Sequence, residues 1–230
     1  MSKISNPVWE EKYKKDILYR NKYPWSEIVT FIFSNFKTLE DRKGKKVLEL
    51  GCGTGSNLIF CAKEGMETYG IDFSSTIISY AKSFSESERV NCNFKIGDFT
   101  SLPYEDSKFD VIIDRSALCL STIEGFKKAI KEAQRVLKPG GLFFLSPFGD
   151  QDSSFHKVPN KDGTIDGITS GHVSGLGGQV LFLSYRDLII IFNETNEWTI
   201  SSMKQIMSTD FNKTDRIQQV TWNVILKKNQ

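Results

Sequence analysis

A glycine-rich turn with an acidic residue just before it is the stretch of this sequence with the clearest chemistry. The apolar run Val47–Leu50 has the size of a buried parallel strand. It is followed by Gly51, Gly53 and Gly55, which let the backbone approach a ligand where any Cβ would clash. The spacing G-x-G-x-G differs from the dinucleotide fingerprint G-x-G-x-x-G. Glu49 would repel a pyrophosphate but suits an ammonium, so the pattern predicts a ligand with a cationic amino-acid end and no phosphate.

Three later apolar runs each end at an aspartate: Asp72, Asp98 and Asp114. Ligands of open parallel sheets bind at the carboxyl ends of the strands. A single aspartate in such a place could be a turn former or a helix cap. Three in succession after a glycine turn predict a ligand site along that edge of the sheet.

The elements that must position these residues alternate between strand and helix. Strands are predicted at 47–50, 67–71, 91–96, 109–113 and 142–146, and helices at 57–64, 76–85 and 124–137. A helix at 184–193 and two strands at 198–207 and 218–226, joined by a polar turn near Asn212, complete the order. We predict an α/β fold with a Rossmann-like, seven-stranded mixed sheet whose last strand is antiparallel, flanked by helices.

The 230 residues are predicted to form one domain with four regions: a helical cap at 1–45, a core at 46–147, a substrate loop at 148–183, and a helix with a strand pair at 184–230. The cap has one helix from Pro7 and a second from Trp25 to Leu39, and Trp9, Tyr13 and Ile17 share one face of the first. The loop is rich in Gly, Ser and Asp, and a loop of this length is usually functional or disordered.

Composition excludes several classes of protein. The four cysteines form no C-x-x-C pair and there are two histidines, so we expect no metal site, no disulfide framework and a cytoplasmic location. No apolar run is long enough to span a membrane. The net charge of +2 is too small to indicate nucleic acid. Residues 1–46 hold 11 basic and 6 acidic residues. This excess of positive charge could favour an anionic substrate, but lysines that face solvent on helices are the simpler interpretation.

The segment E-L-G-C-G-T-G resembles motif I of the class I S-adenosylmethionine (SAM) methyltransferases, and L-K-P-G-G at 137–141 matches that family's turn into the fifth strand. The resemblance implies that the glycines pack against the methionine and ribose parts of SAM and that Asp72 accepts from the ribose hydroxyls. It implies Glu49 near the α-ammonium, Phe73 beside the adenine, Asp98 at the adenine amine with Phe99 next to it, and Asp114 beside the methyl group. The cofactor-binding set is therefore Glu49, Gly51, Gly53, Gly55, Asp72, Phe73, Asp98, Phe99 and Asp114.

Candidates for catalysis and substrate contact are fewer. A sugar hydroxyl needs a general base, whereas a phosphate, a carboxylate or a neutral amine does not. His172 and His156 lie in the long loop, and His172 or Asp114 could be the base, although a solvated loop histidine is the simpler interpretation. Arg115 could clamp a phosphate or carboxylate, or form a surface ion pair.

Aromatic residues of the cap are the remaining candidates. Helical spacing indicates core packing first, but in similar small-molecule enzymes such a helix covers the site. An aromatic ring beside a sulfonium also gains a cation–π interaction. On this basis Tyr13, Tyr23 and Trp25 are predicted to lie near the methyl donor and the substrate.

The sequence is thus identified as a member of the class I methyltransferases, similar to small-molecule enzymes of the type 11 and type 25 groups and to enzymes of bacterial surface-polysaccharide clusters. The expected acceptor is a small polar metabolite, either neutral or anionic, such as a sugar or a phosphate- or phosphoramidate-type group, and no nucleic-acid or membrane partner is expected. The alternatives are an RNA or protein methyltransferase, a non-catalytic SAM-binding subunit and a nicotinamide-linked oxidoreductase. The acceptor atom, oxygen or nitrogen, and the oligomeric state are left open.

Overall fold

The computed structural model describes residues 7–15, 20–194, 196–211 and 216–230. Two predicted features, Ile17 on the first helix and the turn near Asn212, lie outside the described residues. Within those residues, no helix has the length and apolar character that crossing a membrane requires.

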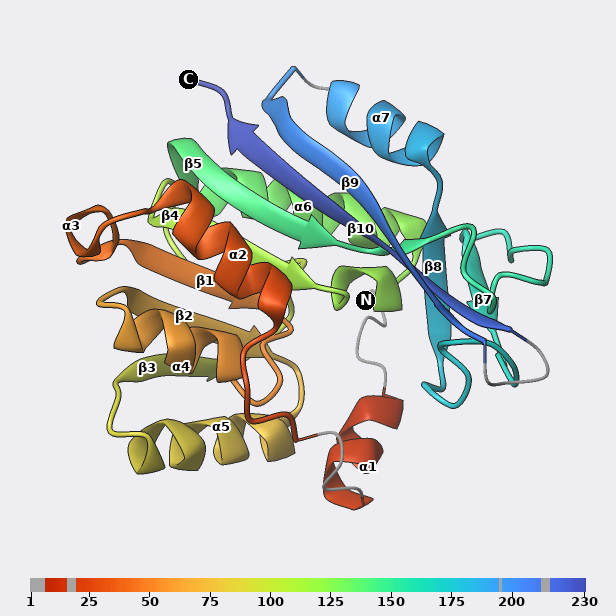
Figure 1. Ribbon diagram of the computed structural model, residues 1–230, viewed down its shortest axis with the longest axis horizontal. Helices are drawn as coiled ribbons and strands as arrows, with labels where there is room; N and C mark the ends of the chain where they lie inside the picture. The colour runs from red at the N-terminus through yellow and green to blue at the C-terminus, as the bar shows by residue number, and fades with distance from the viewer. Residues whose placement is uncertain (1–6, 16–19, 195, 212–215) are drawn as a thin grey trace.

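Seven strands of the described chain form the predicted mixed sheet, in the order β3-β2-β1-β4-β5-β10-β9 (Figure 1). Their bounds are β1 Lys46–Leu50, β2 Glu67–Asp72, β3 Cys92–Ile96, β4 Phe109–Arg115, β5 Leu137–Ser146, β9 Trp198–Asp210 and β10 Ile217–Lys228. Strands β1 to β5 pair in parallel, and β10 runs antiparallel to both β5 and β9. The predicted fold class, with its last strand antiparallel, is confirmed.

Helices cover both faces of the sheet (Figure 1). Their bounds are α1 Pro7–Lys15, α2 Ser26–Asn35, α3 Leu39–Arg42, α4 Ser56–Lys63, α5 Ser75–Ser87, α6 Ile123–Val136 and α7 Tyr185–Asn193, with a short 3-10 helix, η2, at Leu118–Leu120. Polar side chains start several of them: Ser74 accepts from the N–H of Ile77 at α5, and Thr122 accepts from that of Gly125 at α6.

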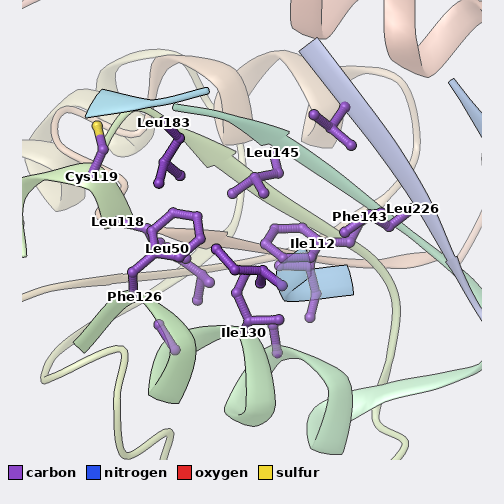
Figure 2. Close-up of a cluster of buried hydrophobic side chains, with 14 of the residues drawn as sticks. Leu50, Ile112, Leu118, Cys119, Phe126, Ile130, Phe143, Leu145, Leu183 and Leu226 are labelled. Atoms are coloured by element: carbon purple, nitrogen blue, oxygen red, sulfur yellow. The ribbon is translucent and has the colours of Figure 1, made fainter. Parts of the chain in front are cut away.

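Apolar side chains along the central strands point alternately to the two faces of the sheet, and this alternation divides the core into two layers. Leu48 and Leu50 of β1 pack with α6 and α7 on one face, whereas Val47 packs with α2, α4 and α5 on the other. In β4, Ile112 belongs to the first layer and Ile113 to the second. This period of two is what a strand buried on both faces requires. Figure 2 shows part of the first layer, with Leu50, Ile112, Phe126 and Phe143 converging above α6.

The glycine turn between β1 and α4 depends on the absence of side chains. Gly51, Gly53 and Gly55 all have positive φ angles, of 63°, 52° and 74°. A Cβ on Gly51 would lie 2.3 Å from the Cβ of Ala117, and one on Gly55 would lie 2.5 Å from the ring of Phe94. At Gly53 the nearest atom to such a Cβ would be 3.6 Å away. Gly51 and Gly55 are therefore required by packing, whereas a Cβ at Gly53 would make only an ordinary van der Waals contact with the Tyr13 hydroxyl.

Three regions differ from the sequence prediction, and the first is the fifth strand, which begins at Leu137 rather than at residue 142. The second cap helix ends at Asn35 rather than Leu39, because Thr38 and Asp41 form a capping box that starts the separate helix α3. The region predicted as a loop contains three strands, β6 Phe148–Gly149, β7 Thr164–Asp166 and β8 Gln179–Leu183, which extend the sheet beyond β10. The described sheet therefore has ten strands rather than seven, because these short segments pair with each other and with Thr221 of β10.

Candidate functional site

A cavity of about 320 Å³ lies at the carboxyl ends of the parallel strands. This volume is at the lower end of the range for ligand sites and has room for one small molecule. Predicted site residues on its wall are Tyr13, Gly51, Asp72, Phe73, Asp98, Phe99 and Arg115. The sequence prediction did not select the seven other lining residues of the described chain, which are Trp9, Gly97, Ser116, Ala117, Leu120, Phe148 and Leu176. Glu49, Gly53, Gly55 and Asp114 do not line the cavity.

Asp72 ends β2 and is held by two backbone donors. Its Oδ2 accepts from the N–H of Gly53 at 3.0 Å, and its Oδ1 accepts from the N–H of Ser74 at 3.0 Å. Each carboxylate oxygen retains a further lone pair for a ligand. Burial raises the pKa of Asp72 to about 6, which the two hydrogen bonds oppose. A pair of ligand hydroxyls fits this carboxylate.

Asp98 and two aromatic rings form the next part of the wall. Oδ1 of Asp98 accepts from both the N–H and the hydroxyl of Thr100, at 2.7 Å and 2.8 Å. This turn fixes the carboxylate after β3, where Phe99 and Phe73 also line the cavity. Two aromatic faces and a carboxylate suit a planar heterocycle that carries an amino group.

Glu49 lies beneath the glycine turn and is fully enclosed. Its Oε1 accepts from Nδ2 of Asn57 at 2.6 Å, and Oδ1 of Asn57 accepts from the backbone N–H of Trp25 at 3.0 Å. Its Oε2 has no hydrogen-bond partner among the described residues. Burial raises the pKa of Glu49 to about 8. An unsatisfied carboxylate oxygen would suit the ammonium group that the sequence predicts, and the contact of Glu49 with a ligand stays a prediction.

The cap helix α1 closes part of the cavity. Its Glu10 accepts hydrogen bonds from the hydroxyls of Ser74 and Thr76, at the start of α5. This anchor brings Trp9 and Tyr13 to the cavity wall. Burial raises the pKa of the Tyr13 hydroxyl well above its usual range. Tyr13 is therefore a neutral donor at the site.

Asp114 and Arg115, which end β4, have different surroundings. Asp114 is fully buried, and its Oδ1 accepts from the N–H groups of Ala117 and Leu118, at 2.9 Å and 3.0 Å, so it caps η2. Burial raises its pKa to about 6, and its Oδ2 has no partner among the described residues. Arg115 lines the cavity with its guanidinium 3.5 Å from the ring centroid of Trp25. Burial lowers the pKa of Arg115, although an arginine stays charged at neutral pH.

Trp25 and Tyr23 were both predicted to face the substrate. Trp25 is 40% exposed and reaches the cavity only through Arg115, on which it stacks. Tyr23 is 78% exposed and does not line the cavity. Their contact with substrate stays a prediction.

The two loop histidines also differ. His156 is exposed, away from the cavity wall. His172 is half-buried, with its Nδ1 3.1 Å from Oδ2 of the buried Asp152, and its ring lies edge-on to Phe148 with the centroids 5.9 Å apart. Sequence reasoning missed Asp152, because nothing in the spacing of two loop residues 20 positions apart indicates that they meet.

The cavity has room and suitable groups for SAM at several of the predicted positions, although Glu49, Gly53, Gly55 and Asp114 lie outside its lining. Asp72 and Asp98 offer carboxylates suited to the ribose hydroxyls and to the adenine amine. The rings of Phe73 and Phe99 line the same cavity. Oε2 of the enclosed Glu49 has no hydrogen-bond donor among the described residues. Asp72, Asp98 and Glu49 would hold the cofactor's polar groups, with Phe73 and Phe99 against the adenine.

Comparison with known proteins agrees with this geometry. The sequence pattern of a methyltransferase domain family matches residues 41–214. A ubiquinone biosynthesis O-methyltransferase from Coxiella burnetii is 34% identical over 107 residues, covering 45% of this chain and 44% of the relative. A norajmaline N-methyltransferase from Rauvolfia serpentina is 27% identical over 125 residues, covering 53% and 42%. The chain thus spans less than half the length of these curated relatives.

Similarity to solved structures extends over most of the chain. A SAM-dependent methyltransferase from Methanosarcina mazei superposes with a TM-score of 0.67 at 21% identity, covering 86% of this chain and 97% of that one. At this identity the likeness concerns the fold. Through the domain matched at residues 41–214, together with the fold and the cavity, this chain belongs to the class I SAM-dependent methyltransferases.

Proposed function

We propose that the protein transfers a methyl group from SAM to a small acceptor that carries an anionic group. The proposed class of acceptor rests on one observation. Arg115 is a cation on the cavity wall, and it forms no ion pair with the described residues. A sugar phosphate or a nucleotide-linked sugar, as in surface-polysaccharide biosynthesis, would have such a group.

The order of the site residues across the sheet supports this assignment. From the β3 edge toward β6, they are Asp98, Asp72, Gly51, Arg115 and Phe148. The residues suited to adenine and ribose come first, and those suited to the amino-acid end of SAM lie around Gly51. Arg115 and Phe148 therefore lie toward the end where the acceptor must approach the methyl group.

Arg115 is suited to bind an anion because its guanidinium lies over one face of the Trp25 ring, with the central carbon 3.5 Å from the ring centroid. A guanidinium carries its N–H donors around the edge of its plane, so stacking on one face leaves them available to a phosphate or carboxylate. The cation is half-buried, which strengthens its attraction for an anion relative to a fully hydrated one.

The reaction needs alignment more than chemical activation from the protein. When bound, SAM supplies a methyl group that is already electrophilic on its sulfonium. The carboxylates and aromatic rings of the wall fix that methyl group, Arg115 fixes the acceptor, and α1 limits the access of water. Such positioning accounts for a large part of the rate of in-line displacements.

The cofactor part is tested by calorimetric titration with S-adenosylhomocysteine, with NADH as the control ligand. Micromolar binding to the wild type, lost in Asp72→Ala, is expected. Binding of NADH instead of S-adenosylhomocysteine would contradict the proposal.

The acceptor class is tested with matched pairs of probes that differ in one anionic group: glucose 6-phosphate against glucose, and 3,4-dihydroxybenzoate against catechol. Release of S-adenosylhomocysteine is the readout. We expect the anionic member to be preferred in kcat/KM by roughly tenfold or more, as one charge-assisted contact implies. The preference should vanish in Arg115→Gln and persist in Arg186→Gln, which removes an exposed arginine of α7. An anion preference that survives Arg115→Gln would contradict the assignment.

A further inference from the structure

Two turns of the segment between β6 and β8 are fastened together by side-chain hydrogen bonds. The hydroxyl of Ser153 accepts from the N–H of His172 at 3.1 Å, and the hydroxyl of Ser154 accepts from the N–H of Val173 at 2.9 Å. Gly171 has a φ of 85°, and a Cβ there would lie 2.5 Å from the N atom of Ser154. The backbone at His172 is therefore fixed against residues that lie about twenty positions earlier.

Asp152 fixes the ring as well as the backbone. Its side chain is fully buried, and Oδ2 accepts from the N–H of Val220 in β10 at 3.0 Å while lying 3.1 Å from Nδ1 of His172. Its Oδ1 accepts from the N–H of Ser154 at 2.9 Å. Burial opposes ionisation, but these hydrogen bonds hold the pKa of Asp152 below its ordinary value. An ionised carboxylate can only accept, so the neutral imidazole carries its proton on Nδ1 and has an unprotonated Nε2.

The His172–Asp152 pair lies near one end of the row of site residues that runs across the sheet from Asp98 to Phe148. This is the end at which the acceptor is expected. The ring of His172 packs edge-on against Phe148, the lining residue at the far end of that row from Asp98. Leu176, four positions after His172, also lines the cavity. His172 is not itself a lining residue, but it contacts Phe148 on the side of the cavity opposite the residues suited to adenine, and an acceptor beyond the methyl group would extend toward that side.

We propose that His172 is the general base of the transfer, that Asp152 is its positioning residue, and that the acceptor atom is therefore a hydroxyl oxygen. This inference rests on the proposed function. In the transfer, the acceptor oxygen forms a bond to the methyl carbon and the C–S bond breaks, with its electron pair going to sulfur. The hydroxyl proton passes to Nε2 of His172, which becomes an imidazolium beside the Asp152 carboxylate. A neutral amine or a carboxylate acceptor would not need this pair.

The first test is spectroscopic and needs no acceptor. The chain has two histidines, so protein labelled with ¹⁵N-histidine gives two imidazoles, and His156→Gln assigns them. We expect neutral His172 to carry its proton on Nδ1. In Asp152→Asn the amide can donate to Nδ1 instead, which shifts the proton to Nε2. A wild-type His172 protonated on Nε2 would overturn the inference.

The second test compares turnover of the same probes in three variants. A general base contributes roughly 10²- to 10⁴-fold, so His172→Gln should lower kcat about 100-fold or more with little change in KM. Asp152→Asn should lower kcat by a smaller factor than His172→Gln does. With an added probe, the more acidic phenol 4-nitrocatechol, the loss of kcat in Asp152→Asn should be smaller still, because this phenol gives up its proton more readily. Asp162→Asn is the matched control, since it removes another loop carboxylate, one that accepts from Thr164.

The outcomes separate the two proposals. A kcat of His172→Gln within threefold of the wild type, in a variant that melts at the wild-type temperature, overturns the base. An equal loss of kcat in Asp162→Asn would assign the effect to loop structure and also overturn it. Where wild type releases no product with any probe, the proposed acceptor class fails, and the tautomer of His172 alone decides the inference.

Discussion

Replacing Glu49 by glutamine should stabilise the protein without cofactor at neutral pH. Burial raises the folded-state pKa of Glu49 from its ordinary 4.5 to about 8, so the folded chain binds this proton more tightly than the unfolded chain. The associated stability is fully present below pH 4.5 and is lost as the pH rises toward 8. At about 1.4 kcal/mol per pH unit, the loss reaches about 3 kcal/mol by pH 7. Glutamine keeps the acceptor for Asn57 and has no proton to lose.

The assay is urea unfolding of both proteins, followed by tryptophan fluorescence, at pH 5, 6, 7 and 8. We expect the difference in the free energy of unfolding to grow with pH in favour of Glu49→Gln, toward about 3 kcal/mol at pH 7. Binding of S-adenosylhomocysteine should weaken at the same time, because the carboxylate suited to its ammonium is gone. The control is Glu105→Gln, which changes an exposed carboxylate. A difference that does not depend on pH would refute the reasoning.

Three further outcomes are expected. Gly55→Ala should lower the free energy of unfolding by about 2–4 kcal/mol, measured in urea, because its Cβ would lie 2.5 Å from the Phe94 ring at a φ of 74°. Gly53→Ala should cost only about 1–2 kcal/mol, the strain of a left-handed residue, and a larger loss than in Gly55→Ala would contradict the packing difference. In a Glu49→Gln background, which removes the other titrating carboxylate of the site, S-adenosylhomocysteine should bind about tenfold more weakly at pH 5 than at pH 7 by calorimetry, because protonation of Asp72 near pH 6 removes its charge, and adding Asp72→Asn should remove that step.

The local part of the site follows from the sequence because the residues that form it are close along the chain. Glu49, Gly51 and Gly55 belong to one strand–turn–helix unit, and the turn brings them together whatever lies elsewhere. Asp72 and Asp98 follow from a second rule, since the ends of parallel strands meet at one edge. Both lie on the wall of the cavity, as predicted.

The three short strands within residues 148–183 could not be predicted from the sequence in this way. Gln179–Leu183 is a short apolar run without flanking periodicity, and β6 and β7 are two and three residues long. Such segments become strands only because a partner is already in place, here Phe148 against Thr221 and Thr164 against Leu181. Their pairing energy comes from residues far away in the chain, which local propensity does not contain.

The sequence by itself determined the class of fold, the cofactor and the glycine turn after β1, because short-range spacing and strand alternation specify them. Only the tertiary structure decided which polar residues meet across long separations. It placed Arg115 over the ring of Trp25 and brought Asp152 to His172. These contacts depend on how distant segments pack, and packing is fixed by the whole core rather than by any local pattern.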